Sequence, residues 1–202
     1  MKKTLILLLS IAVFTACSNN QKKILVITKG KAVIDKDAKT ITATENANNQ
    51  EEQTIEYNTA DKITLQVKSQ AGEKAIDISE NGYYVLNAKP DTIIGSYQSY
   101  SAPKTTTTVI SQDQIKHSID SLQQLLAGNA SAANRNFYLP PNSAVKITDN
   151  MDAYIITPFH QVTSIAQEGD KAPEVYRFYT IKDVRELLSK LQSYTVAKDS
   201  LQ

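Results

Sequence analysis

From residue 24 to residue 100, apolar and polar residues alternate in short segments, which is the pattern of strands that bury one face. The alternation is clearest at Ile63, Leu65 and Val67, which polar residues separate. Short strands at this density are typical of a small antiparallel β-sandwich or barrel. The pattern predicts strands at residues 24–28, 32–35, 39–44, 54–57, 62–68, 74–79, 83–87 and 92–99.

The residues between these segments are suited to turns. Asn81-Gly82 predicts a two-residue hairpin, because both residues tolerate positive φ. Lys89-Pro90-Asp91 predicts a turn in which proline presets φ and aspartate can hydrogen-bond the backbone. Gln70-Ala71-Gly72-Glu73 separates two strands, and the polar stretch 45–53 predicts a loop.

After a connector at residues 101–110, the apolar pattern takes the period of a helix. Ser111 and Gln114 form a capping-box signature, and Gly128 suits a helix C-terminus. A second helix is predicted from Thr180, which Asp183 can cap. The first helix has the apolar face Ile115, Ile119, Leu122, Leu125 and Leu126, and the second has Ile181, Val184, Leu187, Leu188, Leu191 and Tyr194.

Between the two helices, alternation and turn residues predict strands at 144–148, 153–157, 160–165 and 174–179. A helix, three or four antiparallel strands and a second helix make an α+β module at residues 111–198. The fold class is therefore α+β and mostly β, with a β-sandwich-like module at residues 24–100 in front of the α+β module.

Composition narrows the function classes. The 202 residues carry 22 Lys+Arg against 21 Asp+Glu, a formal charge of +1, which gives no electrostatic basis for binding nucleic acid. The hydrophobic share of 41% can support a packed core. The single cysteine excludes an internal disulfide and a thiolate-rich zinc site.

The N-terminus has the features of a secretory signal. Lys2 and Lys3 precede an apolar run at residues 4–16. That run is shorter than the roughly 20 residues of a membrane-spanning helix and fits the apolar region of a signal peptide. We therefore expect the chain to be exported.

The run Phe14-Thr15-Ala16-Cys17 resembles the lipobox of bacterial lipoproteins. Thr15, Ala16 and Cys17 match that pattern, and Phe14 departs from it, since leucine is usual there. The resemblance covers the signal only. It implies removal of residues 1–16, a diacylglycerol on the Cys17 sulfur and a short tether at residues 17–23. Removing Lys2 and Lys3 changes the formal charge from +1 to −1.

The resemblance also implies a location. Multiple acyl chains anchor a protein stably, because each buried methylene contributes about 0.8 kcal/mol. Ser18 follows the cysteine, in place of the aspartate that retains some lipoproteins in the inner membrane. By analogy we expect the outer membrane of a double-membraned bacterium.

Catalytic and metal-binding motifs are scarce in the sequence. Neither His117 nor His160 has a metal-ligand partner at helical or strand spacing, and we expect both to have structural or surface roles. No Gly-x-Ser-x-Gly motif or phosphate-binding glycine loop is present. Asp35-Lys36-Asp37 and Asp149-Asn150-Met151-Asp152 fit turns better than calcium loops. We expect no catalytic residue, no metal and no cofactor.

Ten tyrosines and no tryptophan are the one compositional peculiarity. Strands favour aromatic residues, so these rings can simply fill the core. Consecutive strand residues point to opposite faces, however, and one ring of Tyr83-Tyr84 and of Phe178-Tyr179 can then lie on the surface. Such a patch would bind protein or glycan, and its members would be Tyr83, Tyr84, Tyr97, Tyr100, Phe178 and Tyr179.

These observations favour a non-enzymatic, lipid-anchored envelope protein that binds another envelope component. Two alternatives stay open. One is an envelope hydrolase whose site is assembled in space around His160 and nearby acids. The other is a carbohydrate- or peptide-binding lipoprotein that serves a transporter.

Overall fold

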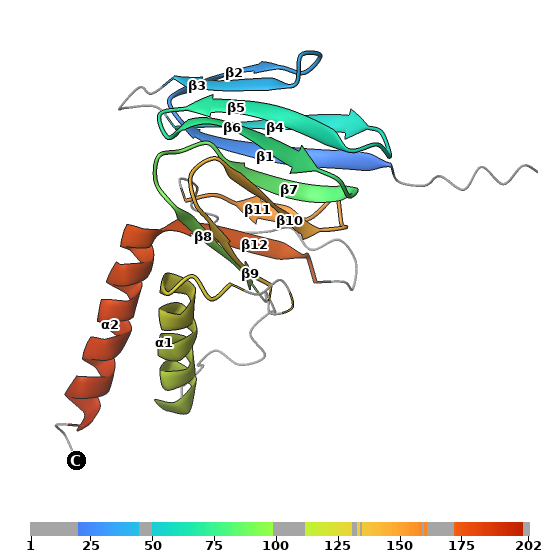
Figure 1. Ribbon diagram of the computed structural model, residues 1–202. Coiled ribbons are helices and arrows are strands. Elements are labelled where there is room, and N and C mark those ends of the chain that lie inside the picture. The colour runs from blue at the N-terminus through green and yellow to red at the C-terminus, as the bar shows by residue number, and fades with distance from the viewer. Residues whose placement is uncertain are drawn as a thin grey trace, which may run out of the picture.

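The computed structural model describes residues 20–44, 50–98, 112–130, 133, 135–158, 160 and 172–199, which form three four-stranded sheets and two helices (Figure 1). The central sheet has the order β10 (Ser143–Thr148), β7 (Gly82–Asn87), β1 (Gln21–Lys29), β4 (Gln50–Asn58). The outer sheet is β2 (Lys31–Asp35), β3 (Thr40–Thr44), β5 (Ile63–Ser69), β6 (Gly72–Ile78). The helix-side sheet is β11 (Tyr154–Ile156), β12 (Val175–Thr180), β8 (Ile93–Gln98), β9 (Asn136–Leu139). The helices are α1 (Gln112–Leu126) and α2 (Ile181–Asp199).

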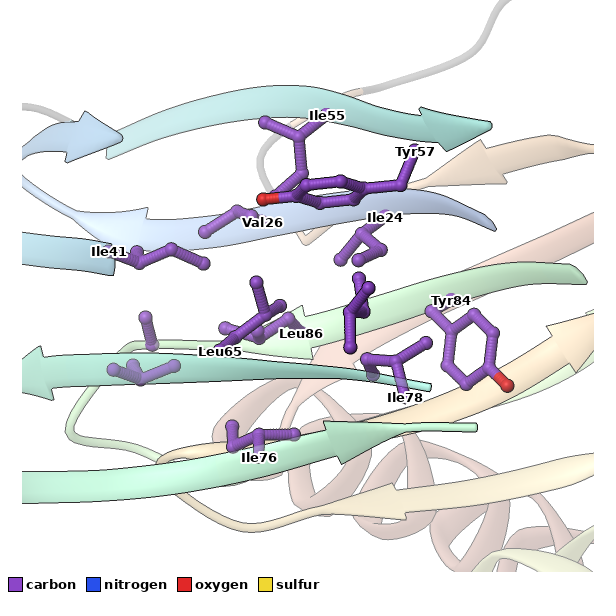
Figure 2. Packing of buried hydrophobic residues seen from close by; sticks show 13 residues of the cluster. Ile24, Val26, Ile41, Ile55, Tyr57, Leu65, Ile76, Ile78, Tyr84 and Leu86 are labelled. Carbon is purple, nitrogen blue, oxygen red and sulfur yellow. The ribbon is translucent and has the colours of Figure 1, made fainter. Parts of the chain in front are cut away.

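The central sheet lies between the other two sheets, and its inner strands β1 and β7 are buried on both faces. On β1, Ile24 and Val26 pack against the outer sheet, as Figure 2 shows, whereas Leu25 and Ile27 pack against the helix-side sheet. Strand β7 repeats this division with Leu86 on the first face and Val85 on the second, as expected for side chains that alternate along a strand. Because other sheets cover both faces of β1 and β7, the sequences of these strands contain continuous apolar runs.

The helix-side sheet is also covered on both faces. Ile93 and Phe178 point to the central sheet, whereas Ile94 contributes to the cluster beneath the helices with Leu125 and Val184. Phe178 lies directly across from Gly95 on β8, and a Cβ atom at Gly95 would come within 2.3 Å of the Phe178 ring. The missing side chain at that position makes room for the ring.

The mostly-β, α+β fold class is confirmed, and each strand predicted between residues 24 and 100 has its counterpart. The helices predicted from residues 111 and 180 correspond to α1 and α2. Thr180 and Asp183 form the reciprocal cap of α2, with backbone N to side-chain O distances of 3.1 Å both ways. Strand β9, which the sequence did not predict, pairs with β8. Of the strand predicted at 160–165, only His160 is described, and it lies outside any strand.

Two local predictions are wrong. The loop predicted at 45–53 is shorter, because β4 begins at Gln50. Polar residues of β4 connect this edge of the central sheet to β2. Gln53 donates to the Ala32 carbonyl, and Glu51 accepts from the Ala32 amide. Asn81-Gly82 is not a hairpin turn, because β7 pairs with β1 and β10 rather than with β6.

The pairing of strands also differs from a purely antiparallel arrangement. Strands β1 and β7, β3 and β5, and β11 and β12 pair in parallel. The central sheet contains β10 from the predicted second module, and β8 of the first module pairs with β9 and β12 of the second. The two predicted ranges therefore share sheets. The connector between them lies outside the described residues.

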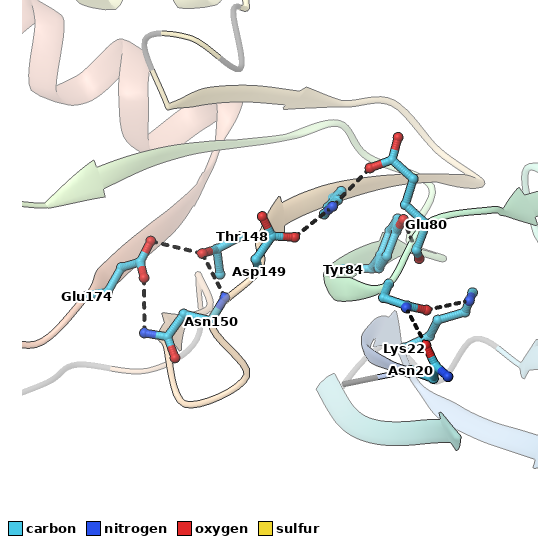
Figure 3. A network of polar contacts seen from close by, with 10 residues as sticks. Asn20, Lys22, Glu80, Tyr84, Thr148, Asp149, Asn150 and Glu174 are labelled. Carbon is cyan, nitrogen blue, oxygen red and sulfur yellow. Dashed lines mark hydrogen bonds and ion pairs between the residues drawn. The ribbon is translucent and has the colours of Figure 1, made fainter. Parts of the chain in front are cut away.

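A fully buried lysine fixes the start of β1. The Lys22 ammonium donates to the Thr59 carbonyl at 2.8 Å, to the Ala60 carbonyl at 3.4 Å and to the Asn81 side-chain oxygen at 2.8 Å. Figure 3 shows this lysine beside Asn20, whose side-chain oxygen accepts from the Asn81 amide. Three oxygens satisfy the three donors of the ammonium group, so β1 and two turns are joined at one point.

Candidate functional site

The predicted aromatic surface patch is not formed. Tyr83, Tyr84 and Phe178 are buried, with exposed fractions of 6%, 7% and 0%. Tyr84 faces the outer sheet and Tyr83 the helix-side sheet. The prediction assumed one open face for the strand that holds both tyrosines, and the three-sheet stack leaves that strand none.

Tyr97 and Tyr179 are half-buried, and Tyr100 lies outside the described residues. The Tyr97 ring packs edge-to-face on Tyr176 with centroids 5.6 Å apart, and the Arg135 guanidinium lies 4.6 Å from the Tyr97 ring centre. Arg177 lies 5.1 Å from the ring centre of Tyr179. Both rings are thus engaged within the fold.

A partly buried carboxylate cluster connects the end of β10 and the turn after it to the start of β12. Glu174 accepts hydrogen bonds from the Thr148 hydroxyl at 3.0 Å, the Asn150 amide at 3.0 Å and the Tyr176 hydroxyl at 2.5 Å (Figure 3 draws the first two). Arg135 approaches the same carboxylate at 4.0 Å. A carboxylate with this many donors is held firmly in one geometry, so the cluster fixes the turn after β10 to the start of β12.

The surroundings of this cluster shift two acid-base equilibria. Burial opposes ionisation of Glu174, but the hydrogen bonds from Tyr176, Asn150 and Thr148, together with Arg135, outweigh burial and lower the pKa of the carboxyl. Burial and the bond to Glu174 raise the pKa of Tyr176 to about 12. The ionised glutamate and the neutral tyrosine are therefore the forms that the fold stabilises.

His160 has an acid beside it. Its Nε2 atom lies 3.4 Å from Glu52, and the same carboxylate accepts a hydrogen bond from the buried hydroxyl of Thr157. In a hydrolase triad the histidine lies between the nucleophile and the acid. Here the acid lies between the hydroxyl and the histidine, so this arrangement does not activate Thr157 as a nucleophile.

The two helices and strands β8, β9 and β12 of the helix-side sheet line a groove of about 370 Å³. The apolar part of its lining comes from the helices, with Leu122 and Leu125 of α1 and Val184, Leu187 and Leu191 of α2. The polar part comes from Ser96 and Gln98 of β8, Asn136 of β9, and His117, Ser118 and Ser121 of α1. His117 is exposed, as the sequence predicted.

The groove continues into a polar cleft of about 710 Å³ beside α1. The two share His117, Ser121 and Asn136. The cleft adds Asp120, Gln124 and Asn129, and the Asn129 amide donates to the Gln124 side-chain oxygen at 2.7 Å. Polar side chains therefore line the cleft, and the cleft adjoins a groove whose lining is partly apolar.

A separate cleft of about 760 Å³ lies at the start of α2. Lys182 and Arg185 line it together with Asp91 and Glu186, and Thr92, Thr180, Ile181 and Ser189 complete the lining. Its charges balance, which gives no preference for an anion or a cation.

Within the described part of the chain, His, Asp and Glu side chains form no group of three that could hold a metal ion. No helix among the described residues is both long and apolar enough to cross a membrane.

Comparison with known proteins yields no relative: no family model, curated protein or solved structure matches the chain. The groove between α1 and α2 is therefore assigned as the candidate site on its geometry alone.

The lowered pKa of Glu174 generates a pH-dependent prediction. The ionised carboxylate stabilises the fold above the ordinary pKa of 4.5, and this contribution is lost as the pH falls through the lower folded value. Glu174→Gln should lower the free energy of unfolding by about 2 kcal/mol near neutral pH. Chemical denaturation across pH should show the difference shrinking in acid.

The exposed Glu73→Gln serves as the matched control, because Glu73 makes only a surface ion pair with Lys68. It should leave the free energy of unfolding nearly unchanged. A loss of stability at Glu174→Gln that stays constant down to acid pH would contradict the assignment.

Proposed function

We propose that this protein is a lipid-anchored component of a bacterial envelope, and that it binds a segment of another envelope protein in the groove between α1 and α2. Two features support the proposal. The signal peptide and the residues up to Cys17 resemble those of lipoproteins. Leucine and valine side chains of both helices form an apolar part of the groove lining.

The observation that carries the binding proposal is the incompletely covered apolar face of α2. Val184 is buried on the sheet, but Leu187 is 40% exposed and Tyr194 is 67% exposed. These residues recur at helical spacing, so they lie on one side of α2. Among the described elements, α1 is the helix that neighbours α2, and the exposed Leu187 and Tyr194 remain available to a partner.

The composition of the groove favours a protein segment as its partner. Leucine side chains offer an apolar lining that can take the side chains of a helix or an extended peptide. The Ser121 hydroxyl and the Asn136 amide in the same lining can hydrogen-bond its backbone. The titratable side chains of the groove lining are those of His117, Tyr97 and Tyr179, and none is a carboxylate, lysine or arginine. We therefore expect the affinity for the partner to depend little on salt concentration.

A second candidate is a lipoprotein that binds carbohydrate. The polar cleft favours it, because Asp120, Gln124, Asn129 and Asn136 present the carboxylate and amide groups that hydrogen-bond sugar hydroxyls. The adjoining groove would then hold the apolar face of the sugar or an attached aglycone.

Anchoring is tested at Cys17. Cys17→Ser removes the only thiol in the chain and with it the atom that lipidation requires. The variant should leave the membrane fraction and lose labelling by a radioactive fatty acid. Labelling equal to that of the unaltered protein would refute the anchor.

Binding is tested by site-specific photo-cross-linking in intact cells. A photoreactive residue at Leu187, inside the groove, should give one discrete cross-linked species. The same residue at the exposed Lys190, on the same helix but outside the groove lining, is the matched control and should give none. Leu191→Glu should abolish the Leu187 product.

Equal products from both positions, or none from Leu187, would contradict the proposal. Mass spectrometry of the product separates the candidates. A second protein sequence supports the protein partner, and a carbohydrate mass without a second sequence supports the sugar.

A further inference from the structure

We propose that the end of the sheet stack at which β1 begins faces the membrane, and that the cleft at the start of α2 points away from it into the aqueous compartment. This inference rests on the lipid anchor of the proposed function. It adds a defined orientation, which a lipid tail alone does not impose.

The chain is fixed very close to the lipid attachment point. Cys17 and Asn20 are three positions apart, and an extended chain advances by at most about 3.6 Å per residue, so about 11 Å separates them at most. Asn20 is hydrogen-bonded to Asn81, and Lys22 is fully buried among three oxygens. The folded body therefore begins within a few residues of the membrane surface.

Three turns lie at the same end of the stack as the start of β1. The β4–β5 turn supplies Thr59 and Ala60 to Lys22, and the β6–β7 turn supplies Asn81. The turn after β10 is held by Lys23, which donates to the Met151 carbonyl at 2.7 Å. Because the tether is short, these turns must be the part of the body nearest the membrane.

Strand pairing shows which elements lie at the opposite end of the sheet stack. Ile27 near the end of β1 pairs with Asn87 at the end of β7, and Ile93 at the start of β8 pairs with Thr180, where α2 begins. Strand β1 has nine residues, which at about 3.3 Å each span about 30 Å. The cleft lined by Asp91 and Arg185 thus lies about one strand length from the membrane end.

Three lysines near the membrane end already have partners within the protein. Lys62 pairs with Asp77 at 2.7 Å, and Lys146 bridges Glu80 at 2.9 Å and Asp149 at 2.8 Å. Lys23 lies 4.4 Å from the centre of the Tyr83 ring. Since these cations have protein partners, the acyl chains rather than anionic headgroups would hold this end at the membrane.

Energy transfer from single fluorophores to the vesicle surface tests the orientation. Cys17 is the only cysteine and is blocked by lipid, so an introduced cysteine is labelled alone. Asp61→Cys and Asp152→Cys place a donor on turns at the membrane end. Gln70→Cys, on the β5–β6 turn, and Ser189→Cys, on α2, place it at the opposite end.

The full lipidated protein is reconstituted in phosphatidylcholine vesicles that carry an acceptor on a headgroup. We expect transfer from positions 61 and 152 to be several-fold larger than from 70 and 189. Equal transfer from all four positions, or the reverse order, would overturn the orientation. Adding anionic lipid should change neither vesicle binding nor the order, and stronger binding would show that headgroups contribute.

Vesicle flotation separates the failure of this inference from failure of the anchor. A protein that does not float lacks the anchor, and the orientation fails with it. A protein that floats but gives equal transfer keeps the anchor and loses only the orientation. Unchanged thermal unfolding of each cysteine variant shows that the label reports on the native fold.

Discussion

The inner strands β1 and β7 of the central sheet are buried on both faces, and the other layers depend on them. Ile24 and Val26 of β1 form the contact with the outer sheet, while Leu25 and Ile27 form the contact with the helix-side sheet. Each outer layer uses the central sheet to cover one of its own apolar faces. Because β1 contributes to both interfaces, a change in that strand affects both cores, whereas a change in β6 affects one.

Local structure was largely predictable, because alternation and helical periodicity report directly which side chains are buried. Ile63, Leu65 and Val67 on β5 are an example. Strand pairing was not predictable in this way, since alternation identifies a buried face and not the neighbour across the hydrogen bonds. The pair Asn81-Gly82 has the composition of a hairpin turn, yet the chain crosses there from the outer sheet to the central sheet. Gly82 is required because a Cβ atom would lie 2.9 Å from the Thr148 carbonyl oxygen.

The candidate site was predictable only in its parts. The apolar faces of α1 and α2 were predicted from their spacing, but the groove forms where both helices meet strands β8, β9 and β12, and no local pattern encodes that meeting. The prediction of an aromatic surface patch was wrong for a related reason. Whether Tyr83 and Tyr84 are both buried depends on the layers above and below their strand, and those layers come from distant parts of the chain. The cluster at Glu174 likewise joins β12 to the turn after β10.

Hydrogen exchange of the native protein, followed amide by amide, tests the central claim most directly. If the doubly buried sheet holds the structure together, the paired amides of β1 and β7 should exchange last and at the rate of global unfolding. Amides of the outer sheet and of the second half of α2 should exchange earlier through local opening. Exchange of the β1 and β7 amides before those of the outer sheet would contradict the account.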